Sequence, residues 1–311
     1  MLATGPWPAG ERPHVDARAV CMATFRNDGC GVPRDMAQVP NIRSNNGIEI
    51  PQLGFGVFQL KPDVTAQTLR TAFDAGYRHI DTAQMYGNEE QVGQAVAASG
   101  IPRDELFVTT KLNNDKHGSD KVPAAMDESL RKLGLDHVDL FLIHWPQPKQ
   151  DRYVETWIAF EKLVSDGKTR SIGVSNFTVA HLERLAAETA TVPAVNQIEL
   201  HPNFTQPELR AHHQAHGIVT EAWSPIGGQG SELLGDERLT SLAEKYGKTP
   251  AQIVLRWHIQ LGNIVFPKSA TPSRIVENID VLDVELADDD MATIAELDNG
   301  GRVGPNPDDL G

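Results

Sequence analysis

Polar and ionisable residues stand at the ends of several short apolar runs in this sequence. The run 77–81 ends at Asp81, and the runs 106–111 and 138–144 end at Lys111 and His144. A phenol, Tyr86, follows Asp81 in a polar loop. Carboxyl, ammonium, imidazole and phenol groups are the side chains that enzymes use to give and take protons. Burying such groups is costly unless they are paired, so their repeated placement favours a functional site.

The apolar runs alternate with longer amphipathic stretches, such as 64–76 and 122–134, which is the pattern of β/α units on a parallel sheet. The predicted strands are 53–56, 77–81, 106–111, 138–144, 170–176, 194–200, 218–224 and 263–269. Eight such units favour a closed (β/α)8 TIM barrel over an open doubly wound sheet. A dinucleotide-binding open sheet would also need G-x-G-x-x-G, whereas Gly54 and Gly56 are followed by Gln59 at the third position.

In a barrel, the carboxyl ends of all strands meet at one face, where barrel enzymes carry their sites. The other predicted strands also end in polar or aromatic residues. These are Ser175, Asn176, Gln197, Trp223, Ser224, Lys268 and Ser269. Each of them alone is explained by an ordinary polar strand end, but together they predict a site at the barrel mouth.

The N-terminal part differs from the rest of the chain. Residues 1–40 are rich in Gly, Pro, Ala, Arg and Asp and lack regular periodicity, so we expect a disordered extension there. Asn46-Gly47 lies between two short alternating runs, which predicts a tight hairpin turn with positive φ at both residues. We expect this N-terminal β-hairpin to close the bottom of the barrel, and residues 41–311 to form a single domain.

Composition excludes several classes of function. With 40% hydrophobic and 23% charged residues, the chain has enough apolar material for a large core. A net charge of −14 repels nucleic acids and anionic membranes, so we expect neither as a partner. Cys21 and Cys30 precede the first regular pattern, which leaves the folded body without thiols for disulfides or zinc. Because no secretory or membrane-spanning segment is recognisable, we expect a cytoplasmic protein, and we expect it to be a monomer.

A metal site is also not expected. His212 and His216 have the i, i+4 spacing that zinc ligands use on a helix. No carboxylate or cysteine completes the set, so a solvated helix face is the better interpretation.

A family resemblance rests on seven motifs that follow one another along the chain. They are HIDTAQMYGNEEQVG, VTTKL, LFLIHWP, GVSNF, NQIELHP, EAWSPIG and PKSATPSRIVENI. In order and spacing they resemble the aldo-keto reductases, over about residues 43 to 300. The segments GFGVFQ, HWPQP and EAWSPIGG are most similar to the prokaryotic 2,5-diketo-D-gluconate reductase group. The resemblance implies NADPH-dependent reduction of aldehydes or ketones, with keto sugars such as 2,5-diketo-D-gluconate among the candidates.

The resemblance implies that Asp81, Tyr86, Lys111 and His144 form a catalytic tetrad. Carbonyl reduction adds a hydride to carbon and a proton to oxygen, and Tyr86 is the implied general acid. An ammonium group about 4 Å away supplies roughly the 4 kcal/mol needed to lower the pKa of a phenol from ~10 to near 7. Asp81 would keep Lys111 charged and in place, and His144 would align the substrate oxygen.

Cofactor contacts are implied in the same way. Trp223 would stack on the nicotinamide, with ordinary core packing as the alternative. Ser175, Asn176 and Gln197 match positions that bind the carboxamide. The implied pyrophosphate loop contains Ser224, Ile226 and Gly228.

The adenosine end of the cofactor would bind near the segment TPSRIVENI. Two cations at a helix N-terminus suit a 2′-phosphate, which favours NADP(H) over NAD(H). The implied phosphate residues are Lys268, Ser269, Thr271 and Arg274, and Glu277 and Asn278 match positions that face the adenine.

Substrate preference is the least determined feature. Phe58, Asn113 and Trp145 are expected to line the pocket together with the tail after Asp298, and Asn113 stands where related reductases of the diketogluconate group often carry Trp. A wider or more polar pocket follows from that change. One other function stays open, namely a nicotinamide-nucleotide-binding barrel that acts as a sensor or scaffold with little turnover. A barrel hydrolase would need paired carboxylates separated by a water-sized gap, and the spacing of the acids indicates no such pair.

Overall fold

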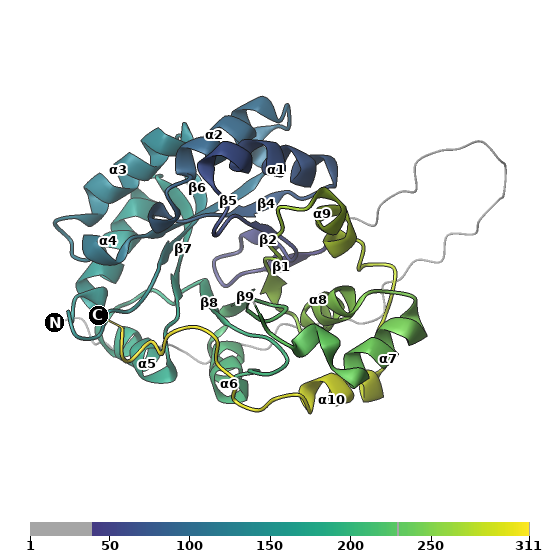
Figure 1. The fold of residues 1–311 in the computed structure, drawn as a ribbon. Helices are drawn as coiled ribbons and strands as arrows, with labels where there is room; N and C mark the ends of the chain where they lie inside the picture. Colours follow the sequence, from purple (N-terminus) through teal and green to yellow (C-terminus); the bar gives the residue numbers. More distant parts are fainter. Residues whose placement is uncertain (1–38, 229, 311) are drawn as a thin grey trace.

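The computed structural model describes residues 39–228 and 230–310, and eight parallel strands form its centre (Figure 1). The strands follow one another around the sheet in the order of the sequence. They are β3 (Phe55–Gly56), β4 (His79–Asp81), β5 (Phe107–Leu112), β6 (Val138–Ile143), β7 (Thr169–Ser175), β8 (Val195–Glu199), β9 (Val219–Trp223) and β10 (Ile264–Val265). All eight predicted strands are therefore present, with ends that differ from the predicted ones by a few residues. The expected disordered extension falls almost entirely on residues 1–38, outside the described residues.

The two edges of the sheet meet, so the sheet is closed. The Gly54 amide donates to the Val265 carbonyl at 2.9 Å, and the Val265 amide donates to the Gln52 carbonyl at 3.0 Å. Leu53 and Val265 also form a parallel bridge. The predicted (β/α)8 barrel is confirmed.

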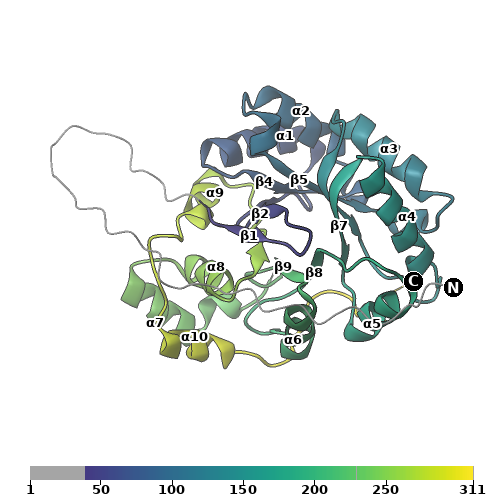
Figure 2. The ribbon, with the colours of Figure 1, turned by 180° about the vertical axis from the view of Figure 1, so that it is seen from behind.

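Helices surround this barrel in both views (Figures 1 and 2). They are α1 (Pro62–Asp74), α2 (Glu89–Ala98), α3 (Val122–Leu133), α4 (Tyr153–Ser165), α5 (Val179–Glu188), α6 (Pro207–His216), α7 (Glu237–Tyr246), α8 (Pro250–Gln260), α9 (Pro272–Ile279) and α10 (Asp288–Ala295). Several of these helices, namely α1, α3, α6, α8 and α9, have a proline in their first turn. Proline is favourable there because that position needs no amide donor. α3 ends at Gly134, whose φ of 65° is readily reached without a Cβ. Local sequence thus explains where α3 begins and ends.

The N-terminal hairpin covers the end of the barrel that faces the viewer in Figure 2. Its strands β1 (Asn41–Arg43) and β2 (Glu49–Pro51) are antiparallel, and Ile50 packs among the apolar side chains at the bottom of the barrel. The predicted two-residue turn is wrong. The Ser44 amide donates to the Ile48 carbonyl and only Gly47 has a positive φ, which describes a three-residue loop ending in a left-handed glycine.

Two apolar clusters support the end of the barrel opposite the hairpin. The larger one fills the space between strands and helices, and a smaller one inside the barrel includes Ile50, Leu140 and Phe266. His79 lies above the inner cluster, with its ring against Phe107 and Phe266. The hairpin and this inner cluster therefore leave the other end of the barrel for polar groups.

Candidate active site

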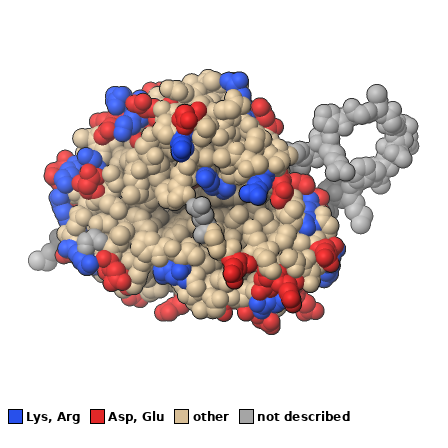
Figure 3. Space-filling model, viewed as in Figure 1, with Lys and Arg blue, Asp and Glu red and all other residues tan. Residues whose placement is uncertain are grey.

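The predicted strand-end residues meet at the mouth of the barrel, which faces the viewer in Figure 1. In the space-filling view this face is hollowed near its centre, with basic side chains above the hollow (Figure 3). Parallel strands in adjacent positions bring their last residues together, so the sheet itself sets the spacing of the side chains.

The implied tetrad is assembled around Lys111. Its Nζ donates to Asp81 Oδ1 at 2.6 Å, to Asp81 Oδ2 at 2.8 Å and to the Thr82 carbonyl at 2.9 Å. Nζ lies 3.4 Å from the Tyr86 hydroxyl oxygen, and the Tyr86 and His144 rings are 5.7 Å apart. Lys111 is fully buried, Asp81 and His144 nearly so, and Tyr86 is half-buried. The four groups thus form one contiguous cluster.

The electrostatics of this cluster differ in one respect from the expectation. Burial lowers the pKa of Lys111, but Asp81 and Tyr86 outweigh it and raise that pKa above its ordinary value. Burial also raises the pKa of Tyr86, and this effect exceeds the lowering by Lys111. The lysine acts in the expected direction, but the expected net lowering of the phenol pKa is wrong because desolvation is the larger effect.

His144 lies at the end of β6, beside the Tyr86 ring. Burial, assisted by the positive charge of Lys111, lowers the pKa of His144 well below its ordinary value. The imidazole is therefore neutral at pH 7. Its Nδ1 is buried and has no hydrogen-bond partner among the described residues.

Side-chain amides hold the loop that carries Tyr86. Gln84 Nε2 donates to the Ala125 carbonyl and to Ser129 Oγ of α3, both at 2.8 Å, and Gln84 Oε1 accepts from the Asn113 amide. Asn88 is fully buried; it accepts from Thr82 Oγ1 at 2.9 Å and donates to the Val57 carbonyl at 3.0 Å. These bonds fix the short 3-10 helix η1 (Gln84–Tyr86) between its neighbours.

A second buried acid, which the sequence analysis missed, adjoins the tetrad. Gln197 Nε2 donates to Asp81 Oδ2 and to Glu221 Oε2, both at 2.9 Å. Glu221 is fully buried on β9, directly opposite Gln197 in the register of β8 and β9. The signal available was the pattern of alternation, since Glu221 stands two residues before Trp223 and so points to the same face of the strand.

The expected carboxamide residues lie together and bond one another. Ser175 Oγ donates to the Gln197 carbonyl at 2.8 Å, and Asn176 Nδ2 donates to Ser175 Oγ and to the His144 carbonyl, both at 3.0 Å. Asn176 Oδ1 accepts from Trp223 Nε1 at 2.8 Å, which fixes the indole plane. Trp223 is half-buried at the mouth, so its ring is available for stacking as well as for packing.

The expected pyrophosphate loop follows β9. Ser224, Ile226 and Gly228 are all half-buried, and Ser224 has an unusual φ of 50°. A Cβ on Gly228 would lie 3.2 Å from Val303 in the C-terminal segment. A side chain larger than that of glycine is therefore disfavoured where this loop meets the tail.

Glu199 anchors the C-terminal segment beside the loop. Its carboxylate accepts from the amides of Val303 and Gly304, the latter at 2.9 Å. The Gly304 backbone lies so close to Trp223 that a Cβ there would come within 2.3 Å of the indole. The C-terminal segment thus borders Trp223, in keeping with the expectation that the tail after Asp298 forms part of the pocket wall.

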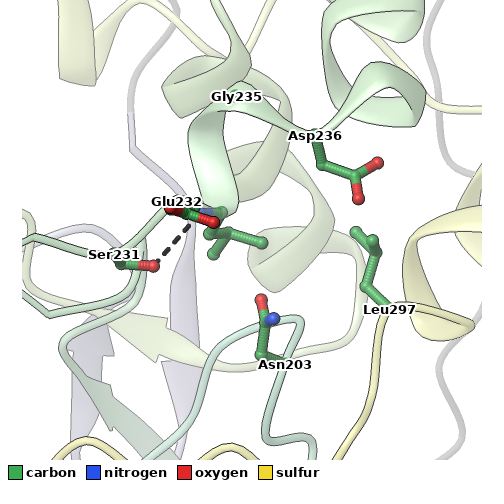
Figure 4. A pocket seen from close by; sticks show the side chains of 7 residues that line it. Asn203, Ser231, Glu232, Gly235, Asp236 and Leu297 are labelled. Carbon is green, nitrogen blue, oxygen red and sulfur yellow. Dashed lines mark hydrogen bonds between the residues drawn. The ribbon is translucent and has the colours of Figure 1, made fainter.

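A cavity of about 690 Å³ lies behind the same loop (Figure 4). Asn203, Ser231, Glu232, Leu233, Gly235, Asp236 and Leu297 line it. Ser231 Oγ accepts from the Leu233 amide at 3.2 Å, which shapes the turn at its edge. The lining contains no member of the tetrad.

The expected phosphate residues lie at the start of α9. Lys268, Thr271 and Arg274 are exposed, whereas Ser269 is buried with its Oγ accepting from the Thr271 amide at 3.0 Å. Lys268 and Arg274 form no ion pair with any carboxylate of residues 39–228 and 230–310. Two unpaired cations at a helix N-terminus suit a phosphate. Glu277 is half-buried and accepts from Thr249 Oγ1 at 2.8 Å, and Asn278 is buried.

The expected pocket residues surround the tetrad unequally. Phe58 is 54% exposed and packs against Tyr86 at 5.0 Å between ring centroids, and Trp145 lies 6.5 Å from Trp223. Asn113 is half-buried, and its side chain accepts from the Asn114 amide at 2.8 Å. Its oxygen thus caps the following turn.

Metal-binding clusters and membrane-spanning helices are both absent from the described part of the chain. No group of three or more His, Cys, Asp or Glu side chains suitable for a metal ion occurs there. His212 and His216 stack on each other with ring centroids 4.2 Å apart. No described helix is long and apolar enough to cross a membrane.

Several known proteins are similar to this chain in sequence and in fold. The aldo/keto reductase family model matches residues 52–299. An aldo-keto reductase of Mycolicibacterium smegmatis is 54% identical over 268 residues, which are 86% of this chain and 97% of that protein. Methylglyoxal reductase DkgA of Escherichia coli is 48% identical over 276 residues, 89% of this chain and 100% of that protein. The structure of a Gox0644 mutant in complex with NADPH has a TM-score of 0.83 and 47% identity, and the match covers 87% of this chain and 98% of that one.

The resemblance inferred from the motifs is confirmed, and so is the placement near the diketogluconate reductase group, to which DkgA corresponds. The chain belongs to the aldo/keto reductase family.

Proposed function

We propose that this protein is an NADP(H)-dependent reductase of aldehydes and ketones with Tyr86 as the general acid. The observation that carries the proposal is the buried Lys111 ammonium group, which contacts both Asp81 at 2.6 Å and the Tyr86 hydroxyl at 3.4 Å. Family membership and the NADPH complex of a relative with 47% identity support the cofactor. Lys268 and Arg274, which form no ion pair within the described residues, fit its 2′-phosphate.

The side chains divide the work of protonation. NADPH, when bound, supplies the hydride that adds to the carbonyl carbon. The Tyr86 hydroxyl gives its proton to the carbonyl oxygen, and Lys111 stabilises the phenolate that remains. Asp81 holds Lys111 in place, and neutral His144 offers a hydrogen bond to the same carbonyl oxygen.

The substrate class follows from the mouth of the barrel. Phe58 packs against Tyr86 and Trp145 lies beside Trp223, while Asn113 has an amide in place of a large aromatic ring. This pocket suits small polar carbonyl compounds, in agreement with a relative named methylglyoxal reductase. Keto sugars such as 2,5-diketo-D-gluconate belong to the same class. The cytoplasmic location and the monomeric state expected from the sequence also stay proposals, to be tested by fractionation and light scattering.

The test is the oxidation of NADPH and of NADH with a panel of α-oxo-aldehydes, keto sugars and simple ketones. We expect turnover with NADPH, and a loss of about 10²- to 10⁴-fold in kcat for Tyr86→Phe with NADPH binding retained. NADPH binding without turnover of any carbonyl compound would instead favour the sensor or scaffold function. Full activity of a folded Tyr86→Phe protein would refute the acid role.

A further inference from the structure

Glu221 is a buried acid that the proposed mechanism does not use. It lies inside the barrel on β9 with no exposed surface. Its Oε2 accepts from Gln197 Nε2, and the same nitrogen donates to Asp81. Two acceptors at 2.9 Å from one NH2 group lie about 5 Å apart. Two carboxyl groups therefore share one amide donor within a buried part of the site.

The cluster is unbalanced when both acids are ionised. Lys111 is the cation that contacts Asp81, and Gln197 carries no charge. Burial and then the nearby Asp81 raise the pKa of Glu221 to about 8, while Gln197 and Lys111 act in the opposite direction. Glu221 Oε1 is buried without a hydrogen-bond partner in the described part of the chain. Near neutral pH the side chain is thus mainly protonated, and it ionises above that range.

The groups that face Glu221 from the neighbouring strands are few. β10 presents the apolar Ile264 opposite it, and β8 presents Gln197. β4 and β5 contribute the titratable Asp81 and Lys111. His79, one layer deeper on β4, is neutral because burial lowers its pKa to about 4. Asp81 and Lys111 are therefore the charges to which Glu221 couples.

We propose that Glu221 is a positioning residue whose ionisation, transmitted through Gln197, Asp81 and Lys111, extends the pH range in which Tyr86 stays protonated. This inference rests on the proposed reductase function. Interacting sites titrate as a unit, so a charge gained at Glu221 alters the proton affinity of the others. A negative charge favours the protonated forms of both Lys111 and Tyr86.

The sign of the effect follows from the roles in the two directions. Reduction needs the protonated phenol and fails above its apparent pKa, whereas alcohol oxidation with NADP⁺ needs the phenolate and rises over the same range. Without the Glu221 charge, the phenol ionises more easily. The falling limb of the pH profile for reduction and the rising limb of the pH profile for oxidation then both move to lower pH. The expected shift is up to about one pH unit for a charge acting over roughly 10 Å.

The experiment compares kcat against pH for the wild-type enzyme, Glu221→Gln and Glu89→Gln, in both directions of the reaction. Glu221→Gln keeps an acceptor for Gln197 and removes only the ionisable group. Glu89→Gln is the matched control: Glu89 is also nearly fully buried, but its carboxylate accepts a hydrogen bond from Thr110 Oγ1 at 2.8 Å instead of from Gln197. We expect both limbs to move in Glu221→Gln and neither to move in Glu89→Gln.

The outcomes are separable. A folded Glu221→Gln enzyme with lower rates but unmoved limbs overturns the inference and leaves the reductase function intact. A wild-type protein that binds NADPH but reduces no carbonyl compound overturns the proposed function itself. If Glu221→Gln does not fold, infrared titration of the Glu89→Gln protein replaces it. A protonated-carboxyl band that disappears in the range of the reduction limb supports the inference, and the absence of such a band overturns it.

Discussion

Replacing Lys111 by Met tests the centre of the proposed mechanism. The Nζ–Oη distance of 3.4 Å corresponds to about 5 kcal/mol of stabilisation of the phenolate at an effective dielectric constant near 20. Because burial already raises the pKa of Tyr86, loss of the ammonium group leaves a much weaker acid. We expect kcat for reduction to fall by about 10³-fold, which corresponds to roughly 4 kcal/mol.

The assay is single-turnover hydride transfer at fixed pH, with NADPH affinity and thermal unfolding measured on the same samples. Met fills the volume of the lysine stem, but Asp81 loses its buried partner. Breaking a buried ion pair costs about 3–5 kcal/mol of folding free energy. The activity of the variant must therefore be measured at a temperature below its unfolding transition. Lys116→Met, which removes a partly exposed lysine that pairs with Asp115 at 3.8 Å, is the matched control.

A double variant decides whether Lys111 acts through the phenol. If it does, adding Lys111→Met to Tyr86→Phe lowers the rate little further, because the group that the lysine serves is already gone. Fully additive losses, or an unchanged rate in folded Lys111→Met alone, would refute the reasoning. In that case the lysine would be a structural partner of Asp81 only.

Two further predictions address the cofactor and acid stability. Lys268→Ala and Arg274→Ala should each raise the Kd for NADPH by about 10- to 100-fold, as expected for charge-assisted hydrogen bonds, with no change for NADH; equal effects on both cofactors in fluorescence titrations would count against the phosphate site. Burial lowers the pKa of His213 and of His258 to about 3. The unfolded chain therefore binds more protons below pH ~6.5, and the free energy of unfolding falls by about 1.4 kcal/mol per pH unit per histidine between pH 6 and 4. The free energy of unfolding of His213→Gln, measured with urea at pH 7, 6 and 5, should fall less steeply with decreasing pH than that of the wild-type protein. An unchanged pH dependence would show that His213 is not neutral in the fold.

The barrel and the meeting of Asp81, Lys111 and His144 were predictable because they depend on short-range pattern, whereas their roles as a tetrad with Tyr86 were implied by the family resemblance. Each strand ends in a polar residue directly after an apolar run, and parallel strands bring those ends together whatever the helices between them are. Asp81 and Lys111 meet for this reason, being on adjacent strands. The motif order then gave the family without any knowledge of distances.

What was missed depends on surroundings that a pattern does not contain. The raised pKa of Tyr86 results from desolvation by residues scattered along the chain. Glu221 belongs to a strand whose neighbours are chosen by the closed sheet, and its bond to Gln197 follows only from the register. The hairpin turn was wrong because Asn-Gly fits two loop lengths, and the Ser44 bond to Ile48 selects the longer one.

The residues of the site are held in place in two ways, by the sheet and by a loop, and the sheet is the more rigid support. Asp81 and Lys111 belong to the sheet, where ladder bonds on both sides hold the strands in register. Tyr86 belongs to a single 3-10 turn, which is held mainly by the side chains of Gln84 and Asn88. Tyr86, the proposed proton donor, is therefore the residue of this cluster whose position we expect to be easiest to disturb. A contact of 3.4 Å to Lys111, longer than the 2.6 Å contact to Asp81, is consistent with that order. Changes in the loop should accordingly alter the rate of proton transfer before they alter the buried ion pair.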